Sequence, residues 1–324
     1  MTLRKAIKII LPILMVSYIG VAYMLSNKVL EPNSSFEKTL HDIENYWGTT
    51  YEEMMALLPD PQPMALTSAD GTSISGQYFS VSDSAQCVFI FSHGWGRSWH
   101  NMLKYYPMVE DCNCNVVMYD HRAHGESGGD FPTGGIKEAD DLIAVTMWVT
   151  KNKGYSLDQM AWLGSSWGAS TALIAGAKGE NPAFIVADSP FQDWYSAIFE
   201  RAIKDYGAGI KVIAPGVMAI VNLRTGINYR DASPLKWAEG IEAPVLLIHS
   251  EGDPKTNSQQ SVRISEMLNE QSEFHHTSWD NIHVMDVINN KEDLKQILNA
   301  FIIKNKFSFF LPVKTDTLDY ATTN

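Results

Sequence analysis

A serine placed between two glycines is the first feature of the sequence that could do chemistry. The stretch "WLGSSWGAS" at residues 162–170 fits the pattern G-x-S-x-G, with Ser166 at its centre and Gly164 and Gly168 on either side. An apolar segment precedes it and a helical pattern follows, the context in which this turn exposes the central serine. We therefore expect Ser166 to be a nucleophile. Ser165 lacks symmetric glycines, and a purely structural turn is the competing interpretation.

A serine hydroxyl needs a base to activate it, and the base needs a carboxylate to orient it. After a turn of this kind the expected chain order is Ser, then Asp or Glu, then His. Asp253 follows the apolar segment "VLLIHS", and His283 lies in a loop after "EFHHTSW". The sequence therefore predicts a Ser166, His283 and Asp253 triad.

Other acids and histidines could fill these places. Glu251 lies close to Asp253, and Asp188 follows the preceding apolar segment. His275 and His276 lie inside the segment expected to be the last strand, where one side chain would point into the core and the other outward. Their positions make them weaker candidates than Asp253 and His283.

Two backbone amides are expected to hold the oxyanion that forms during acyl transfer. One is the N–H of Trp167, directly after the nucleophile, and the other comes from the loop "HGWG" at residues 93–96, where Trp95 is the candidate. The side chains of Trp95 and Trp167, with Trp99 nearby, could line the pocket mouth. The alternative is that these indoles pack against the loop after "YDHRAHG".

Short apolar segments alternate with helical patterns from about residue 63 onward. The segments are "QCVFIFSHG", "CNVVMYDHR", "MAWLGSS", "AFIVADS", "APVLLIHS" and "EFHHTSW". Such alternation predicts an α/β fold with a mostly parallel sheet covered by helices on both faces. A helical stretch at about 191–240 is a candidate lid, and Phe199, Val212, Ile213 and Val217 would add apolar side chains to a pocket.

The N-terminal 30 residues differ from the rest of the chain. Arg4, Lys5 and Lys8 precede an uncharged run from Ile9 to Leu25, which is about the length needed to cross a bilayer. We expect an uncleaved single-pass anchor over 1–30 with a cytoplasmic N-terminus and an extracytoplasmic catalytic domain. A cleaved signal peptide and a buried helix are the alternatives.

The remaining domain boundaries follow from the composition of the chain and its pattern of apolar residues. Residues 31–62 are expected to form an amphipathic connector, in which Ser34 and Glu37 fit a capping box before a helix running toward Trp47. Residues 63–306 would form the catalytic domain, and 307–324 a C-terminal tail.

Charge and cysteine content narrow the partners. A net charge of −12 should repel nucleic acid, and no cysteine or histidine spacing suggests a metal site. Three cysteines are present, and Cys87 and Cys114 lie near the starts of strands expected to be neighbours. We expect free buried thiols, with a bridge from Cys87 to Cys114 or Cys112 as the alternative.

At this point the chain resembles the α/β-hydrolase superfamily, and in particular membrane-anchored bacterial members of the serine aminopeptidase-like or acyl-hydrolase-like kind. The stretches that carry the resemblance are "FSHGWGRSWHN", "VVMYDHRAHGESGG", "GSSWGAS", "LLIHSEGD" and "NIHV", in family order. The resemblance implies an eight-stranded, mostly parallel sheet and a triad without a cofactor. It also implies that Asp120, Arg122, His124 and Ser127 brace the site loops, and Ala123 and Ser250 stand where glycine is usual.

The sequence therefore predicts a membrane-tethered serine hydrolase that cleaves acyl esters or thioesters of small molecules through an acyl-enzyme. A serine aminopeptidase or amidase is the nearest alternative, and a catalytically silent binding protein is the alternative from another class. We expect neutral acyl groups of short to medium length, because the motifs contain no cluster of charged residues. The oligomeric state is left open.

Overall fold

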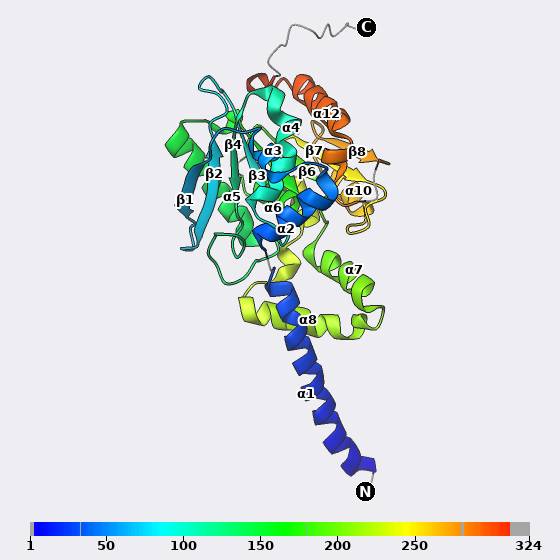
Figure 1. Cartoon of the computed structure of the whole chain (residues 1–324). Coiled ribbons are helices and arrows are strands. Elements are labelled where there is room, and N and C mark those ends of the chain that lie inside the picture. The colour runs from blue at the N-terminus through cyan, green and yellow to red at the C-terminus, as the bar shows by residue number, and fades with distance from the viewer. Residues whose placement is uncertain (1–2, 33, 180, 280–281, 312–324) are drawn as a thin grey trace.

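The computed structural model describes residues 3–32, 34–179, 181–279 and 282–311. Its centre is one eight-stranded sheet in the order β1-β2-β4-β3-β5-β6-β7-β8 (Figure 1). β1 pairs antiparallel with β2 and β2 antiparallel with β4, whereas the six strands from β4 to β8 run parallel. The strands are β1 (Gln62–Thr67), β2 (Ser73–Phe79), β3 (Val88–Ser92), β4 (Asn115–Tyr119), β5 (Met160–Ser165), β6 (Phe184–Asp188), β7 (Val245–Ser250) and β8 (Glu273–Thr277). The predicted fold class is confirmed.

Helices cover both faces of the sheet because successive side chains of each central strand point to opposite sides. Phe89 and Phe91 of β3 pack into the cluster that contains α4 and α12, whereas Val88 and Ile90 pack into the cluster that contains α5 and α6. This two-sided burial explains why the strands are continuously apolar in sequence. The helices that pack on the two faces of the sheet are α4 (Tyr106–Val109), α5 (Ile136–Lys153), α6 (Trp167–Gly176), α10 (Gln259–Ser265), α11 (Asp286–Asn289) and α12 (Lys291–Lys304).

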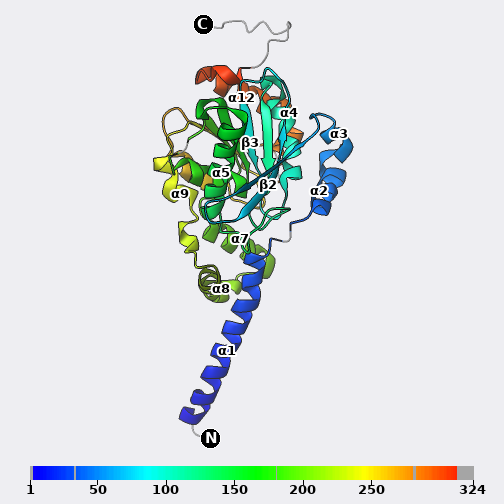
Figure 2. The same cartoon turned by 90° about the vertical axis from the view of Figure 1, so that its left-hand side faces the viewer.

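The segment between β6 and β7 is helical, as the lid expectation requires. It contains α7 (Trp194–Tyr206), α8 (Ile210–Thr225) and α9 (Pro234–Trp237), with short 3₁₀ turns at Tyr229–Asp231 and Ala238–Gly240. Asp193 caps α7 by accepting a hydrogen bond from the Ser196 amide. Figures 1 and 2 place α7 and α8 below the body, between the sheet and the projecting part of α1.

The N-terminal segment forms one long helix, α1 (Leu3–Leu30), which projects from the body (Figures 1 and 2). Its section Ile7–Leu30 is long enough and apolar enough to cross a membrane, a property that membrane anchors and signal sequences share. α8 lies across α1: the Tyr18 hydroxyl donates to the Val212 carbonyl at 3.1 Å, and Arg224 donates to Ser26 at 2.7 Å.

The connector differs from its predicted capping. α2 (Phe36–Asp42) begins one residue later than expected, with Ser35 at the N-cap position and no side-chain cap. The Ser34 hydroxyl instead accepts a hydrogen bond from the Gly125 amide at 3.0 Å, which removes it from the capping position. A π-helical turn (Ile43–Trp47) and α3 (Tyr51–Met55) follow, the latter with a capping box formed by Thr50 and Glu53.

Two further segments pack onto the main domain. Residues 99–112 form 3₁₀ turns at Trp99–Tyr105 and Glu110–Cys112 on either side of α4. Near the end of the described chain, the Phe307 ring stacks on Phe184, and the Phe310 ring meets Phe184 edge to face. They belong to the core rather than to a tail that begins at 307, and residues 312–324 lie outside the described part.

The expectation of free thiols is wrong, because Cys87 and Cys114 form a disulfide. The residues precede β3 and β4, which pair in parallel, and this register brings their Cα atoms to 4.7 Å. Cys112 remains a buried free thiol, and burial raises its pKa to about 12.

The disulfide gives a direct prediction. In denatured, unreduced protein we expect only Cys112 to react with iodoacetamide, whereas reduction should expose all three thiols. Because the bridge closes a loop with a sequence separation of 27, the Cys87→Ser, Cys114→Ser double variant should lose about 2–4 kcal/mol in free energy of unfolding. Alkylation of three thiols without reduction, counted by mass spectrometry, would contradict the bridge.

Candidate active site

Ser166 lies in a strained turn between β5 and α6. Its backbone has φ 54° and ψ −112°, which few residues other than glycine adopt. A Cβ on Gly168 would lie 2.0 Å from the Ser92 carbonyl oxygen, and one on Gly164 would lie 2.4 Å from the Gly168 carbonyl oxygen. Both positions therefore require glycine. The close approach of α6 to β3 and β5 holds the Ser166 side chain beyond the end of the strand.

His283 lies between Ser166 and Asp253, as the sequence predicts. Its Nε2 is 2.7 Å from Ser166 Oγ, and its Nδ1 is 2.5 Å from Asp253 Oδ2. The three side chains come from the turn after β5 and from the loops after β7 and β8, which meet because parallel strands end at one edge of the sheet. This chain of contacts can carry a proton from the serine to the imidazole.

Asp253 is held as a carboxylate by donors on every side. Its oxygens accept hydrogen bonds from the backbone amides of Lys255 at 2.7 Å and Thr256 at 3.0 Å. Burial alone would raise the pKa of Asp253, but the charge of His283 and the hydrogen bonds from His249, His283 and Thr256 hold it well below its usual value. The carboxylate is therefore ionised throughout the neutral pH range.

The sequence reasoning missed His249, which supports Asp253. Its Nε2 faces two acceptors, Asp253 Oδ2 at 3.2 Å and the Thr256 carbonyl at 3.1 Å, so Nε2 must carry the proton. The Ser261 hydroxyl then donates to Nδ1 at 2.7 Å. The histidine is fully buried within the segment "VLLIHS", and its polar type inside an apolar strand was the available signal.

The alternative acids and bases have other partners. The Tyr105 hydroxyl donates to Asp188 at 2.5 Å and lies 3.1 Å from the Ser165 hydroxyl, so both residues form a buried network beneath the turn. Glu251 is exposed.

The two histidines of β8 also lie away from Ser166. His275 contacts Glu273 at 3.2 Å, and His276 contacts Ser258 at 3.0 Å. One of the two was expected to point into the core, but neither is buried. Both side chains are half-buried because β8 is the edge strand of the sheet.

The loop predicted to supply an oxyanion amide packs against the nucleophile turn. A Cβ on Gly94 would lie 3.6 Å from Ser166 Cβ, in ordinary contact. Within the described residues, the amides of Trp95 and Trp167 have no hydrogen-bond acceptor. Two unpartnered amides in segments that meet at Ser166 are suited to bind a developing oxyanion.

Two neutral histidines fix that loop. The His121 amide donates to His93 Nε2 at 3.0 Å, and the Gly96 amide donates to His124 Nε2 at 3.2 Å. Each Nδ1 must therefore carry the proton and donate to a carbonyl, that of Gly94 or that of Arg122. Burial lowers the pKa of His93 well below its usual value and that of His124 to about 4, which keeps both neutral.

The other residues of the "YDHRAHGESGG" stretch have bracing contacts. Asp120 accepts hydrogen bonds from the amides of Trp99 at 2.8 Å and Glu126 at 2.9 Å, and Arg122 pairs with Asp141 at 2.6 Å. Ser127 Oγ donates to the Asp120 carbonyl at 2.6 Å. Ala123 has φ 57°, which explains why the resemblance leads one to expect glycine there.

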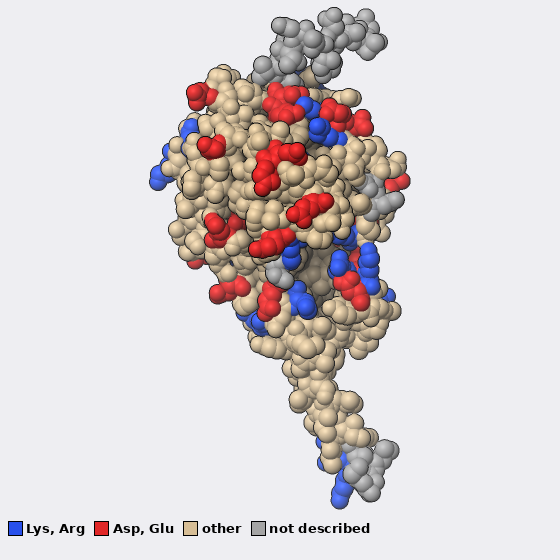
Figure 3. All heavy atoms as spheres, viewed as in Figure 1, with Lys and Arg blue, Asp and Glu red and all other residues tan. Residues whose placement is uncertain are grey.

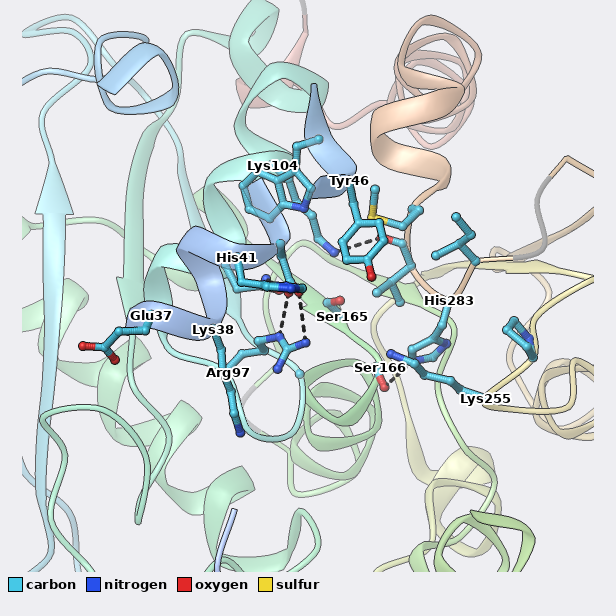
Figure 4. Close-up of a pocket in the computed structure, with 18 residues that line it drawn as sticks. Glu37, Lys38, His41, Tyr46, Arg97, Lys104, Ser165, Ser166, Lys255 and His283 are labelled. Atoms are coloured by element: carbon cyan, nitrogen blue, oxygen red, sulfur yellow. Dashed lines mark hydrogen bonds and ion pairs between the residues drawn. The ribbon is translucent and has the colours of Figure 1, made fainter. Parts of the chain in front are cut away.

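Two chambers meet at Ser166 and His283. The first, about 750 Å³, opens beside α2 (Figure 4), and we call it the polar chamber because several charged side chains line it. Its charged walls include Lys38, Arg97, Lys104 and Lys255 against Glu37 and Asp42. Arg97 pairs with Asp42 at 2.9 Å. No pattern in the sequence predicts this chamber, because its residues are scattered over the connector and four loops.

The second chamber, about 400 Å³, is apolar and lies between α1, α7 and α8. Trp95, Trp167 and Trp194 line it near Ser166. The Trp167 ring also packs against His121 and His124, at centroid distances of 4.6 and 4.9 Å. The Trp167 indole thus both lines the pocket and packs against the loop that contains His121 and His124.

Two side chains expected near the pocket, those of Trp99 and Val212, have different surroundings. Trp99 stacks on His100 instead, at a centroid distance of 3.7 Å. Among the lid residues, Val217 lines the apolar chamber, whereas Val212 faces outward with 75% of its surface exposed.

Comparisons with known proteins agree with this architecture. The family model of the X-Pro dipeptidyl-peptidase (S15 family) matches residues 114–211, which include Ser166 but neither Asp253 nor His283. The uncharacterized protein YqkD of Bacillus subtilis (strain 168) is 36% identical over 190 residues, 58% of this chain and 62% of that protein. The chain thus spans less than two thirds of the length of this relative.

Solved structures share the fold at low sequence identity. An esterase of Pyrococcus furiosus is 22% identical with a TM-score of 0.64, covering 79% of this chain and 94% of the esterase. The acylaminoacyl peptidase of Pyrococcus horikoshii is 17% identical with a TM-score of 0.56, covering 81% of this chain and 43% of the peptidase. The fold is that of the α/β hydrolases.

Proposed function

We propose that this protein is a serine hydrolase that cleaves acyl esters through Ser166, His283 and Asp253. The observation that carries the proposal is the position of the His283 ring, whose two nitrogens contact Ser166 Oγ at 2.7 Å and Asp253 Oδ2 at 2.5 Å. A base held between a nucleophile and an orienting carboxylate, next to two free amides, is an arrangement suited to acyl transfer.

In the proposed reaction, Ser166 Oγ attacks the acyl carbonyl while His283 Nε2 takes the hydroxyl proton. The Trp95 and Trp167 amides stabilise the resulting oxyanion. When the carbonyl re-forms, the bond to the leaving alcohol breaks, and His283 returns the proton to that oxygen. A water molecule then attacks the acyl-enzyme with His283 as base, which releases the carboxylic acid and restores Ser166.

The two chambers suit different parts of the substrate, the acyl group and the leaving group. The apolar chamber has the lining expected of an acyl-group pocket, with Phe191, Ile198 and Met218 among its walls. The polar chamber on the other side of Ser166 would then take the leaving group. Its lining contains four lysine or arginine side chains and two carboxylates, so it favours a neutral or anionic leaving group.

Amide cleavage is the second candidate, favoured by the match to the S15 peptidase model. An aminopeptidase must bind the protonated amine at the end of a peptide, which requires a carboxylate without a competing cation. In the polar chamber Asp42 is paired with Arg97, and cations outnumber acids. This balance favours esters over aminoacyl amides.

We further propose that α1 is an uncleaved membrane anchor, with the catalytic domain outside the cytoplasm. Leu25 and Val29 of α1 line the apolar chamber, and Ala22 and Leu30 are buried against the lid. A segment that completes the pocket is better suited to retention than to removal. The Cys87–Cys114 bridge supports an oxidising compartment.

The triad predicts a sharp contrast between neighbouring residues. Ser166→Ala should lower hydrolysis of p-nitrophenyl butyrate by about 10³-fold or more, because the triad acts as a unit, and should abolish fluorophosphonate labelling. Ser165→Ala should retain activity. His283→Ala should resemble Ser166→Ala, whereas His275→Ala should resemble the wild type. Equal losses in Ser165→Ala and Ser166→Ala, with folding intact, would refute the assignment.

The charge of the polar chamber predicts the preferred bond. Purified protein should hydrolyse short and medium acyl esters with a higher kcat/KM than aminoacyl amides of matched side chain. Thioesters should be cleaved in the same rank order of acyl length, since the acyl pocket is shared. A clear preference for aminoacyl amides would replace the esterase proposal by the aminopeptidase alternative and leave the triad unchanged.

The anchor predicts a fractionation result. Full-length protein should pellet with membranes and resist extraction by alkaline carbonate, because the apolar section Ile7–Leu30 would span the bilayer. N-terminal sequencing of the membrane fraction should find residues of the first turn of α1. Recovery of the protein chiefly as a shortened soluble form would favour signal cleavage instead.

A further inference from the structure

The helix α8 is apolar on two opposite faces, which is unusual for a helix at the surface of a soluble domain. One face, with Ala214, Val217, Met218 and Val221, is buried against the apolar chamber and α1. On the opposite face, Val212 and Leu223 are 75% and 84% exposed, and Pro215 and Ala219 between them are exposed as well. A helix that is hydrophobic all round is normally surrounded by protein or by lipid.

The position of α8 on α1 indicates which of these surrounds it. The Val212 carbonyl accepts a hydrogen bond from Tyr18, and Arg224 binds Ser26 and Asn27. These contacts place α8 beside the second half of α1. Leu25 is the last apolar residue of α1 before the polar residues Ser26, Asn27 and Lys28, so Tyr18 lies about 10 Å below this polar boundary at 1.5 Å per residue. Helices that lie in the membrane interface are buried to about 5–10 Å.

Charge and surface chemistry are consistent with that depth. α8 carries Lys211 and Arg224 but no acidic residue, as is common in helices that lie on membranes. On the face shown in Figure 3, the projecting part of α1 shows no acidic or basic side chain until its tip, where lysine and arginine side chains lie. The exposed apolar side chains of α8 therefore continue the apolar surface of α1.

The apolar chamber connects this surface with the nucleophile. Leu25 and Val29 of α1 and Ala214 and Val217 of α8 form its wall on the membrane side. Ser166 and His283 lie at its inner end. An acyl chain lying between α1 and the lid would leave the bilayer and reach Ser166 without crossing water.

We propose that α8 lies in the extracytoplasmic interface of the membrane that α1 spans, with four side chains in contact with lipid: Val212, Pro215, Ala219 and Leu223. The acyl substrate in this proposal is a membrane lipid ester that enters between α1, α7 and α8. The substrate part of this inference rests on the proposed ester hydrolysis, whereas the docking of α8 does not. Docking and substrate are therefore tested separately.

The docking test measures lipid contact directly. Full-length Leu223→Cys in a Ser166→Ala background is labelled with the fluorophore NBD and reconstituted in phosphatidylcholine and phosphatidylglycerol vesicles. Met147→Cys on α5, 46% exposed in the wild type, is the matched control, and unmodified protein shows whether the buried Cys112 reacts. We expect blue-shifted emission and quenching by doxyl-labelled lipids at position 223 only.

Two results would overturn the docking. Emission at position 223 that is neither blue-shifted nor quenched, as expected at position 147, would place α8 in water. A blue shift at position 223 without doxyl quenching would assign the exposed face to a protein, such as a second copy of the chain. Neither result depends on catalysis, so the proposed function would be unaffected.

The substrate test compares two esters in the wild type and in Leu223→Glu, with Met147→Glu as control. The charge should lower hydrolysis of a long-chain monoacylglycerol carried in phosphatidylcholine vesicles by about tenfold, because it disfavours immersion of α8. Hydrolysis of soluble p-nitrophenyl butyrate should stay within about twofold, since Leu223 lines neither chamber. Met147→Glu should change neither rate.

The outcomes separate the two proposals. If the wild type cleaves the soluble ester but not the vesicle-borne ester, or if Leu223→Glu affects both equally, the lipid substrate is refuted and ester hydrolysis stands. If the wild type cleaves neither ester, the proposed function itself fails.

Discussion

The contact on which the site depends most is the approach of the α6 N-terminus to the end of β3. Gly168 sits so close to the Ser92 carbonyl that any side chain would collide with it. This contact fixes the positive φ of Ser166 and brings the Trp167 amide next to the loop that carries Trp95. His93 and His124, both neutral and buried, then hold that loop: His93 Nδ1 donates to the Gly94 carbonyl, and His124 Nε2 accepts from the Gly96 amide. The strain at one serine is thus balanced by packing and hydrogen bonds around it.

The sequence predicted the fold and the candidate triad because both follow from local patterns in a fixed order. Apolar segments bounded by turns locate parallel strands, and parallel strands bring their carboxyl ends together. Asp253 and His283 could therefore be placed beside Ser166 without coordinates. The same logic brought Cys87 and Cys114 to adjacent strand starts, but it could not set the register that aligns them, which decided the bridge.

Features that depend on contacts between distant segments were not predictable in this way. The polar chamber combines α2 side chains such as Lys38 with Arg97 and Lys255 from separate loops, and no spacing in the chain relates them. Ser34 matched a capping box, but the Gly125 amide competes for its hydroxyl. His249 was hidden in an apolar strand, and only the geometry shows that it supports Asp253.

The packing of α1 against the lid bears on the role of the N-terminal segment. A tether needs only to cross the bilayer, yet Ala22, Val29 and Leu30 are almost fully buried together with Trp194, Val217 and Met218. Removing α1 would expose these apolar side chains to water, which costs roughly 25 cal/mol per Å² of uncovered surface. It would also open the apolar chamber, since Leu25 and Val29 form part of its wall. This coupling favours a retained helix over a cleaved signal, and it makes α1 a structural part of the pocket beside Ser166.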